Sequence, residues 1–287
     1  MRYRFLRFPE GRPRAFTLSY DDGCLQDIRF SEILNKYGVK CTFNLNSDVH
    51  KGENALSKET VIEKFLDKGH EIAVHGAFHR APGAVRAVEG IRDVLDCRLE
   101  LERKYDMIIR GMAYPDIGIT RFSNGASYEN IRGYLKDLDI AYSRTLGGDN
   151  DGFELPNDWY AWMPTAHHKN PEIFNYIDKF LAIDFSDKAY KAAKRPRLFY
   201  LWGHSYEFDR DDNWDRIEQI LERIANRDDV WYATNIEIYD YITAYDSLRF
   251  SADGTIVYNP TLIKVWFEID GNRLYSIAPG ETLRIKE

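Results

Sequence analysis

Residues 15–23 read AFTLSYDDG, an apolar, β-prone segment that runs directly into two carboxylates and a glycine. In parallel α/β proteins, functional side chains collect where strands end. Asp21 and Asp22 would repel each other if both were ionised in a poorly solvated place. The stretch therefore predicts a strand that ends at a site, and a positive charge near that site.

The chain around this stretch alternates between strand-like and helix-like segments. Strands are predicted at residues 15–20, 41–45, 71–74, 108–113, 140–143, 198–202 and 230–233. Helices are predicted at residues 28–37, 58–68, 84–105, 127–138, 171–183, 213–226 and 236–244. Seven such repeats predict a parallel α/β sheet that either stays open or closes into a barrel.

The pattern changes after Tyr245. Residues 248–286 alternate in short runs that are separated by the turn-forming sequences ADG, NPT, DGN and APGE. We expect a few antiparallel strands there, which are too few to form a large core of their own. The predicted division is a barrel over residues 1–246 and a β-strand appendage over residues 247–287 that packs on it.

Composition restricts the classes of function. The net charge of −7 over 287 residues argues against nucleic acid as a partner, because phosphate binding needs a basic face. No apolar run is long enough to span a bilayer. The three cysteines form no CxxC pair, and the N-terminal residues lack the apolar core of a signal peptide. We expect a cytoplasmic protein, with an exported mature form as the alternative; the oligomeric state is not predicted.

Polar residues follow four of the predicted strands. They are Asp21 and Asp22 after the first, His75 and His79 after the third, Tyr114 and Pro115 after the fourth, and His204 after the sixth. A helical turn would place His75 and His79 on one face. Two histidines and one carboxylate form a metal site with open positions for water and substrate. One aspartate would then bind the metal, and the other would act as a general base.

Each of these signals has an ordinary explanation when it is taken alone. DDG after a strand is most often a β-turn, and HxxxH occurs by chance. His167 and His168 lie in a predicted loop, where adjacent side chains point apart and rarely bind one metal together. The order of the signals at successive strand ends favours the functional interpretation.

The motifs LSYDDG, HGAFH, MAYP, DWY and LWGH resemble, in order, the five motifs of the polysaccharide deacetylases, the carbohydrate esterase family with the NodB-homology domain. The resemblance covers about residues 14–245. It implies a distorted (β/α)7 barrel, here with a short C-terminal β-rich appendage. Members remove acetyl groups from N-acetylated or sometimes O-acetylated sugars with one divalent ion. Zinc is the expected ion, and cobalt, nickel and manganese are alternatives.

The resemblance also implies roles for single residues. Asp21 matches the general base, and Asp22, His75 and His79 match the metal ligands. Tyr114, Pro115 and Asp116 match the third motif, in which the backbone N–H after the proline helps to hold the oxyanion. Leu201 matches the wall of the acetyl pocket and His204 the general acid. Asp158 matches the carboxylate that tunes this histidine, and Trp159 matches a further pocket wall. We also expect His168 to contact the substrate.

The third motif departs from the family pattern. Ala113 stands where members carry an arginine that pairs with the base, and Arg110 would need a different backbone path to reach the site. Asp21 is therefore expected to depend on the metal alone to stay ionised. Asp116 stands where a tyrosine is usual, which is expected to change contacts with the substrate.

These observations predict a metal-dependent deacetylase that acts on an acetylated glycan through a metal-bound water, an aspartate base and a histidine acid. One alternative is an amidohydrolase that cleaves a C–N bond in a small molecule other than a sugar. A second is a carbohydrate-binding homologue with little or no turnover.

Overall fold

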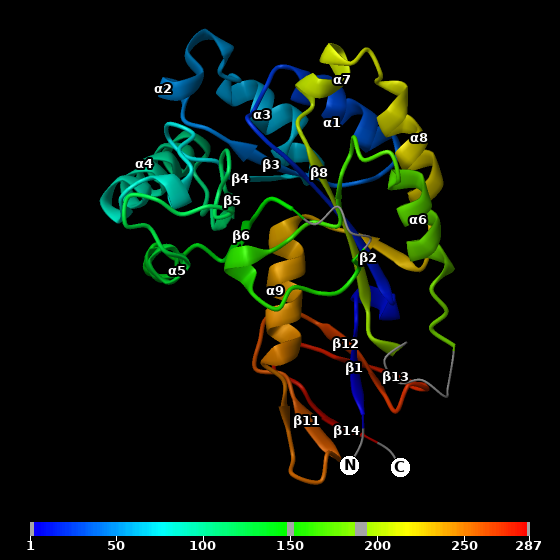
Figure 1. Ribbon diagram of the computed structural model, residues 1–287. Coiled ribbons are helices and arrows are strands. Elements are labelled where there is room, and N and C mark those ends of the chain that lie inside the picture. Colours follow the sequence, from blue (N-terminus) through cyan, green and yellow to red (C-terminus); the bar gives the residue numbers. More distant parts are fainter. Residues whose placement is uncertain (1–2, 148–151, 187–193, 286–287) are drawn as a thin grey trace.

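The computed structural model describes residues 3–147, 152–186 and 194–285. Its centre is a curled sheet with the strand order β6-β5-β4-β3-β2-β8-β7, and β9 pairs with the start of β2 (Figure 1). The bounds of these strands are β2 Arg14–Tyr20, β3 Thr42–Leu45, β4 Glu71–Val74, β5 Gly111–Ala113, β6 Tyr142–Arg144, β7 Ala166–His167, β8 Arg197–Gly203 and β9 Val230–Tyr232. Neighbouring strands are parallel, so their C-terminal ends share one edge.

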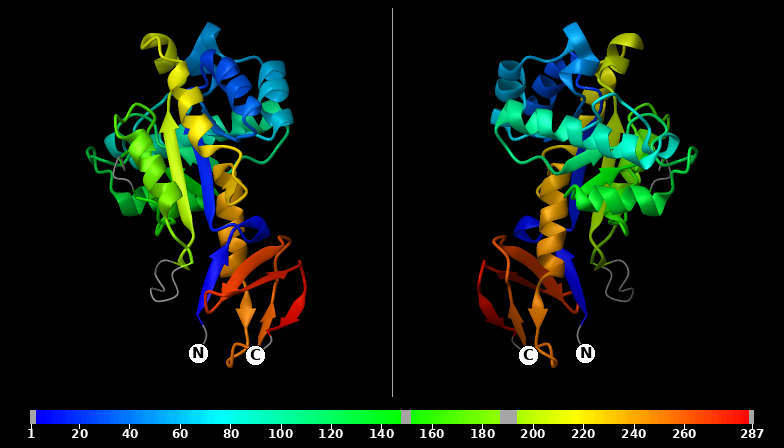
Figure 2. Two further views of the ribbon diagram at one scale, coloured as in Figure 1. Left: turned by 90° about the vertical axis from the view of Figure 1, so that its right-hand side faces the viewer. Right: turned by 90° about the vertical axis from the view of Figure 1, so that its left-hand side faces the viewer.

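Helices cover the outside of this sheet (Figures 1 and 2). Their bounds are α1 Gln26–Lys36, α2 Asp48–Lys51, α3 Lys58–Lys64, α4 Ala87–Tyr105, α5 Tyr128–Asp137, α6 Ile173–Ala182, α7 Tyr206–Arg210, α8 Asp215–Ile224 and α9 Asn235–Asp246. Apolar side chains of the sheet and of the covering helices form the main core, which is centred on residues such as Phe16, Phe43 and Leu221.

The gap between β6 and β8 is bridged by a short segment that the sequence did not reveal as a strand. The backbone N–H of Trp162 donates to the Ser143 carbonyl of β6 at 3.1 Å, and four residues later Ala166 pairs with Leu201 of β8. Residues 162–166 therefore pair with β6 at one end and with β8 at the other. This irregular closure is the distortion of the (β/α)7 barrel, and it confirms the predicted fold class.

The C-terminal strands form two small antiparallel sheets, with the orders β1-β12-β13 and β10-β11-β14. The bounds are β1 Arg4–Arg7, β10 Arg249–Phe250, β11 Ile256–Tyr258, β12 Val265–Ile269, β13 Arg273–Ile277 and β14 Thr282–Arg284. Because β1 pairs with β12, the first strand of the chain belongs to this unit and not to the barrel sheet. This pairing differs from the predicted division at residue 246. Figure 2 shows the unit at one end of the molecule, reached through α9.

Local signals explain several element boundaries. The Ser57 side chain accepts from the backbone N–H of Thr60 and so caps the N-terminus of α3. The predicted helix over residues 58–68 becomes α3 followed by a 3-10 turn, after which Gly69 takes the left-handed conformation with φ 79°. Within the described ranges, no helix is both long and apolar enough to cross a membrane.

Candidate active site

Three of the predicted site residues meet at the C-terminal edge of the sheet. Oδ1 of Asp22, after β2, lies 3.5 Å from Nε2 of His75 and 3.3 Å from Nε2 of His79, which both follow β4. One donor atom from each residue lies within 4.8 Å of the other two. We call Asp22, His75 and His79 the triad.

The backbone brings the triad together through unusual conformations. Asp22 has φ 78° and His79 has φ 54°, a region that non-glycine residues seldom adopt outside turns and functional sites. The predicted helical turn over residues 75–79 is wrong, because this segment is a loop. Gly76, with φ 85°, passes so close to α4 that an added Cβ would lie 2.3 Å from Asp93 Oδ2. Asp93 also accepts from the N–H of Phe78 at 2.7 Å and so holds the loop in place.

The donor set of the triad fits a divalent ion. Nδ1 of His75 lies 3.0 Å from the carbonyl of Ala113, so this nitrogen carries the proton and the lone pair of Nε2 faces Asp22. Burial lowers the pKa of His75, which favours the neutral ring that a metal requires. Burial alone would raise the pKa of Asp22, but the contact with His79 and the charges around it lower that pKa overall. Two imidazoles and one carboxylate suit zinc, and also cobalt or nickel.

Asp21 lies beside the triad and is almost fully buried, with 2% exposed. Its Oδ1 accepts from the side-chain amide of Asn44 at 2.8 Å, and its Oδ2 pairs with the guanidinium of Arg144. The expectation that Asp21 has no neighbouring cation except the metal is therefore wrong. Ala113 and Arg144 are partners in the register of β5 and β6, so the arginine comes from the adjacent strand at the same level of the sheet.

Two asparagines, like Arg144, lie at the site although no motif marks them. Asn44 is the residue that donates to Asp21, and Asn46 donates to the carbonyls of His75 at 2.6 Å and Gly76 at 3.1 Å. Both lie at the end of β3 and are buried. The signal was present as TFNLN, in which polar residues alternate with apolar ones at the end of a strand.

His204 follows β8 and faces both aspartates. Its Nε2 lies 3.9 Å from Oδ2 of Asp21 and 3.9 Å from Oδ2 of Asp22. Its Nδ1 lies 3.5 Å from Oε2 of Glu207, in the first turn of α7. Burial opposes protonation of His204, but the carboxylates of Glu207, Asp21 and Asp22 raise its pKa overall. A protonated imidazole is thus favoured at the place predicted for the general acid.

The predicted partner of this histidine is wrong. Asp158 accepts from the Tyr128 hydroxyl at 2.5 Å and from the N–H of Tyr160 at 2.9 Å, and no contact joins it to His204 in the described part of the chain. Asp158 caps a short 3-10 turn instead. Trp159, in that turn, is partly buried and packs edge-on against Trp162 and against Tyr239 of α9.

The loop after β5 lies beside the triad. The Tyr114 ring is buried, and its hydroxyl donates to the carbonyl of Tyr160 at 2.8 Å. Pro115 lies against the loop at Gly76. Asp116 is exposed, with φ 49°, and its negative charge contributes to the raised pKa of His79, after the contact with Asp22 and against burial. These positions agree with a loop that borders the site.

Two predicted substrate contacts are buried instead. His168 is 1% exposed, because its ring packs against Phe208 at 4.4 Å and its Nδ1 meets the Tyr20 hydroxyl at 3.1 Å. Leu201 is fully buried in the main core. Neither side chain offers a surface to a substrate in this structure, so the predicted substrate contacts of His168 and Leu201 are not supported by it.

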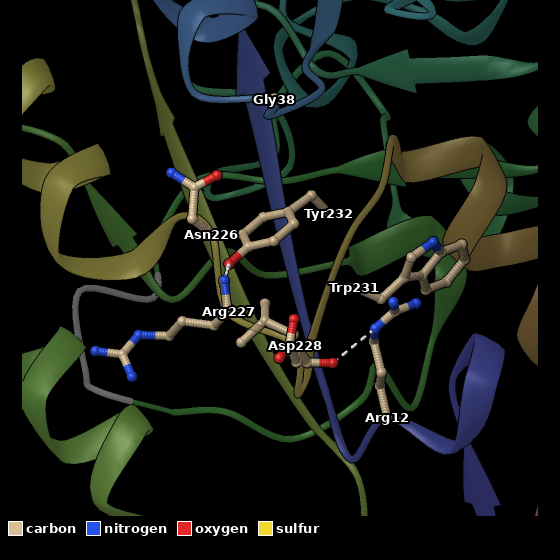
Figure 3. Close-up of a pocket in the computed structure, with 8 residues that line it drawn as sticks. Arg12, Gly38, Asn226, Arg227, Asp228, Trp231 and Tyr232 are labelled. Atoms are coloured by element: carbon tan, nitrogen blue, oxygen red, sulfur yellow. Dashed lines mark hydrogen bonds between the residues drawn. The ribbon is translucent and has the colours of Figure 1, made fainter.

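A hollow of about 420 Å³ lies elsewhere on the molecule (Figure 3). The loops before β2 and β9 line it: Arg12 Nε donates to the carbonyl of Asp228 at 2.9 Å, and the N–H of Arg227 donates to the Tyr232 hydroxyl at 3.0 Å. These loops lead into the N-terminal ends of β2 and β9, whereas Asp22 follows the C-terminal end of β2. The hollow therefore lies at the opposite edge of the sheet and does not belong to the site.

The comparison with protein families agrees with this geometry. The polysaccharide deacetylase family model matches residues 9–142, which include Asp21, the triad and the loop after β5. Residues 9–142 belong to the polysaccharide deacetylase family. The match ends before Arg144 and His204, so the family model does not cover them, and the structure places both beside Asp21. A comparison with curated protein sequences found no match.

Solved structures of polysaccharide deacetylases share the fold. A putative polysaccharide deacetylase from Mycobacterium smegmatis is 15% identical, with a TM-score of 0.55 over 86% of this chain and 96% of that one. A probable polysaccharide deacetylase from Pseudomonas aeruginosa PAO1 is 14% identical, with a TM-score of 0.56 over 81% and 92%. Puue allantoinase is 11% identical, with a TM-score of 0.55 over 81% and 91%. At these identities the similarity establishes the fold.

Proposed function

We propose that this chain is a metal-dependent hydrolase that removes acetyl groups, in the first place N-acetyl groups, from a glycan. The observation that carries the proposal is the convergence of the triad, Asp21 and His204 at one edge of a deacetylase-type sheet. When bound by the triad, a divalent ion would act as a Lewis acid on the acetyl carbonyl and would activate water for attack.

The residues of the chain have separate tasks in this reaction. Asp21 takes the proton of the attacking water, and its pairing with Arg144 and Asn44 fixes the carboxylate for that transfer. The N–H of Asp116 makes no hydrogen bond within the described residues, which leaves it free to donate to the developing oxyanion. His204 gives its proton to the departing amine from Nε2, the nitrogen that faces Asp21 and Asp22.

The same features bear on the two alternative functions. A binding homologue without turnover was suggested by Ala113, and Arg144 removes that reason because the base keeps a paired cation. The fold shared with an allantoinase supports, as the second candidate, hydrolysis of a C–N bond in a small molecule other than a sugar.

The test is release of acetate. Purified protein is loaded with zinc or cobalt and incubated with N-acetylated and O-acetylated oligosaccharides and with allantoin, each with and without a chelator. We expect chelator-sensitive acetate release from an acetylated glycan. Turnover of allantoin alone would replace the proposal with the second candidate, and binding of glycan without acetate release would favour the non-catalytic alternative.

A further inference from the structure

A second cluster of polar side chains lies behind His204. Oε2 of Glu207 lies 3.5 Å from Nδ1 of His204, 3.1 Å from Nε2 of His167 and 3.4 Å from Nε2 of His168. Glu207 is 8% exposed. Three imidazole nitrogens thus surround one carboxylate oxygen on the side of His204 that faces away from the triad.

The geometry of His167 argues against a second metal site in this cluster. Nδ1 of His167 accepts a hydrogen bond from the N–H of Lys169 at 3.1 Å, so the proton of the neutral ring is on Nε2. That nitrogen faces Glu207 and offers a proton rather than a lone pair. In the triad the situation is reversed, because Nδ1 of His75 donates to Ala113 and leaves Nε2 free.

Glu207 is itself held in one orientation. Arg210 donates to its Oε1 at 2.9 Å, which leaves Oε2 directed at the histidines. Burial would raise the pKa of Glu207, but the contacts with His167 and His204 lower that pKa, so the group is an anion. Nδ1 of His204 is a buried atom without a hydrogen bond in the described ranges, and Oε2 of Glu207, which also faces His167 and His168, is a carboxylate oxygen 3.5 Å away that can accept from it.

We propose that Glu207, and not Asp158, is the positioning residue that holds His204 for proton donation. Its carboxylate accepts from Nδ1–H of His204 and thereby directs the protonated Nε2 to the leaving group between Asp21 and Asp22. At 3.5 Å the contact is longer than a normal hydrogen bond, and we expect it to shorten when substrate binds, as catalytic contacts often do. This role rests on the proposed deacetylation.

The first test compares two leaving groups. An amine leaves only after it is protonated, whereas the phenolate of para-nitrophenyl acetate leaves without an acid. Glu207→Gln should lower kcat on an N-acetylglucosamine oligomer by about 10–100-fold and lower turnover of the aryl ester much less. Glu207→Asp should recover part of the loss. The matched control is Asp158→Asn, which should affect both substrates equally.

Equal losses on both substrates in Glu207→Gln would mean that Glu207 is only structural. A selective loss in Asp158→Asn would return the role to Asp158. Metal content is measured in each variant: loss of an ion from Glu207→Gln with the triad intact would identify the cluster as a metal site and overturn the proposal.

A second test needs no substrate, so it separates failure of this proposal from failure of the proposed function. Proton NMR of the imidazole N–H region should show a slowly exchanging Nδ1–H of His204 in the wild type. The signal is assigned by its loss in His204→Gln. It should disappear in Glu207→Gln and remain in Asp158→Asn. Persistence of the signal in Glu207→Gln would contradict the contact on which the proposal depends.

Discussion

The guanidinium of Arg144, at the end of β6, pairs with the buried carboxylate of Asp21, at the end of β2. The pair joins residues 123 positions apart. The Arg144 side chain is fully buried and lies over the Trp202 ring at 4.4 Å. A cation held in this way by three strands is a fixed part of the site.

Arg144→Gln should therefore reduce both the stability and the turnover of the protein. Removing one partner of a buried ion pair leaves the other charge uncompensated, so the free energy of unfolding should fall by about 3–5 kcal/mol. Turnover should fall by about 10–100-fold, because the base loses its fixed orientation. Arg110→Gln, which breaks a surface pair with Asp139, is the control and should change stability by less than about 0.5 kcal/mol. The measurements are denaturant unfolding and acetate release.

The register of β5 and β6 allows a stronger version of this experiment. Because Ala113 and Arg144 are neighbours on adjacent strands, Ala113→Arg combined with Arg144→Ala returns a guanidinium to the same region. We expect the double variant to regain part of the turnover that Arg144→Ala loses. No recovery in a folded double variant would show that the position of the cation, and not only its presence, matters.

The assignment of the triad predicts which side chains metal binding requires. His75→Ala combined with His79→Ala should remove one bound ion per chain, since a single carboxylate rarely retains zinc. Elemental analysis of protein dialysed against metal-free buffer measures this. Unchanged metal content in the double variant would contradict the assignment of the triad.

The two adjacent aspartates should respond differently to the same substitution. Asp21→Asn keeps the size of the side chain but cannot take a proton, so it should retain metal and lose turnover. Asp22→Asn replaces an anionic ligand with a neutral one, so excess metal should partly restore its activity. Metal content and turnover are compared in both variants. Metal loss from Asp21→Asn only would reverse the two roles.

His204→Ala should lower kcat by about 10²–10⁴-fold while metal binding is retained, because the residue is expected to donate a proton and not to bind the ion. Acetate release and elemental analysis of the same preparation provide the two readouts. Turnover close to the wild type would make His204 structural.

Asp27 should make stability depend on pH. It is fully buried and accepts from Ser205 Oγ at 2.6 Å and from the N–H of Cys24 at 3.0 Å, so it joins the loops that carry Asp22 and His204. Burial raises its pKa from 3.8 to about 7. Between these values the folded chain binds more protons than the unfolded chain, so the free energy of unfolding falls as pH rises through this window.

Asp27→Asn should reduce that slope, because an amide cannot ionise and can still donate to Ser205 and accept from Cys24. Burial also raises the pKa of Glu71 to about 7, so a slope of the same sign should remain in the variant. Chemical unfolding between about pH 4 and pH 8 measures both slopes. Identical slopes in wild type and variant would show that Asp27 titrates normally.

The sequence alone was enough to predict the barrel and the triad. Both depend on local pattern: apolar runs mark the strands, and side chains that follow parallel strands must arrive at one edge of the sheet. The site candidates at these strand ends could therefore be named in advance: Asp21, Asp22, His75, His79 and His204. The order of the motifs does not establish which side chains contact each other: it pairs Asp158 with His204, whereas Asp158 caps a turn elsewhere.

Tertiary structure decided which charges meet. Arg144 had no motif of its own, and it reaches Asp21 only because β5 and β6 pair with Ala113 and Arg144 in register. Glu207 faces His204 because α7 begins directly after β8, and His168 became part of the core because Phe208 of α7 covers its ring. Strand ends follow from local sequence, whereas the partner of a buried charge depends on strand register and helix packing, which act between residues far apart in the chain.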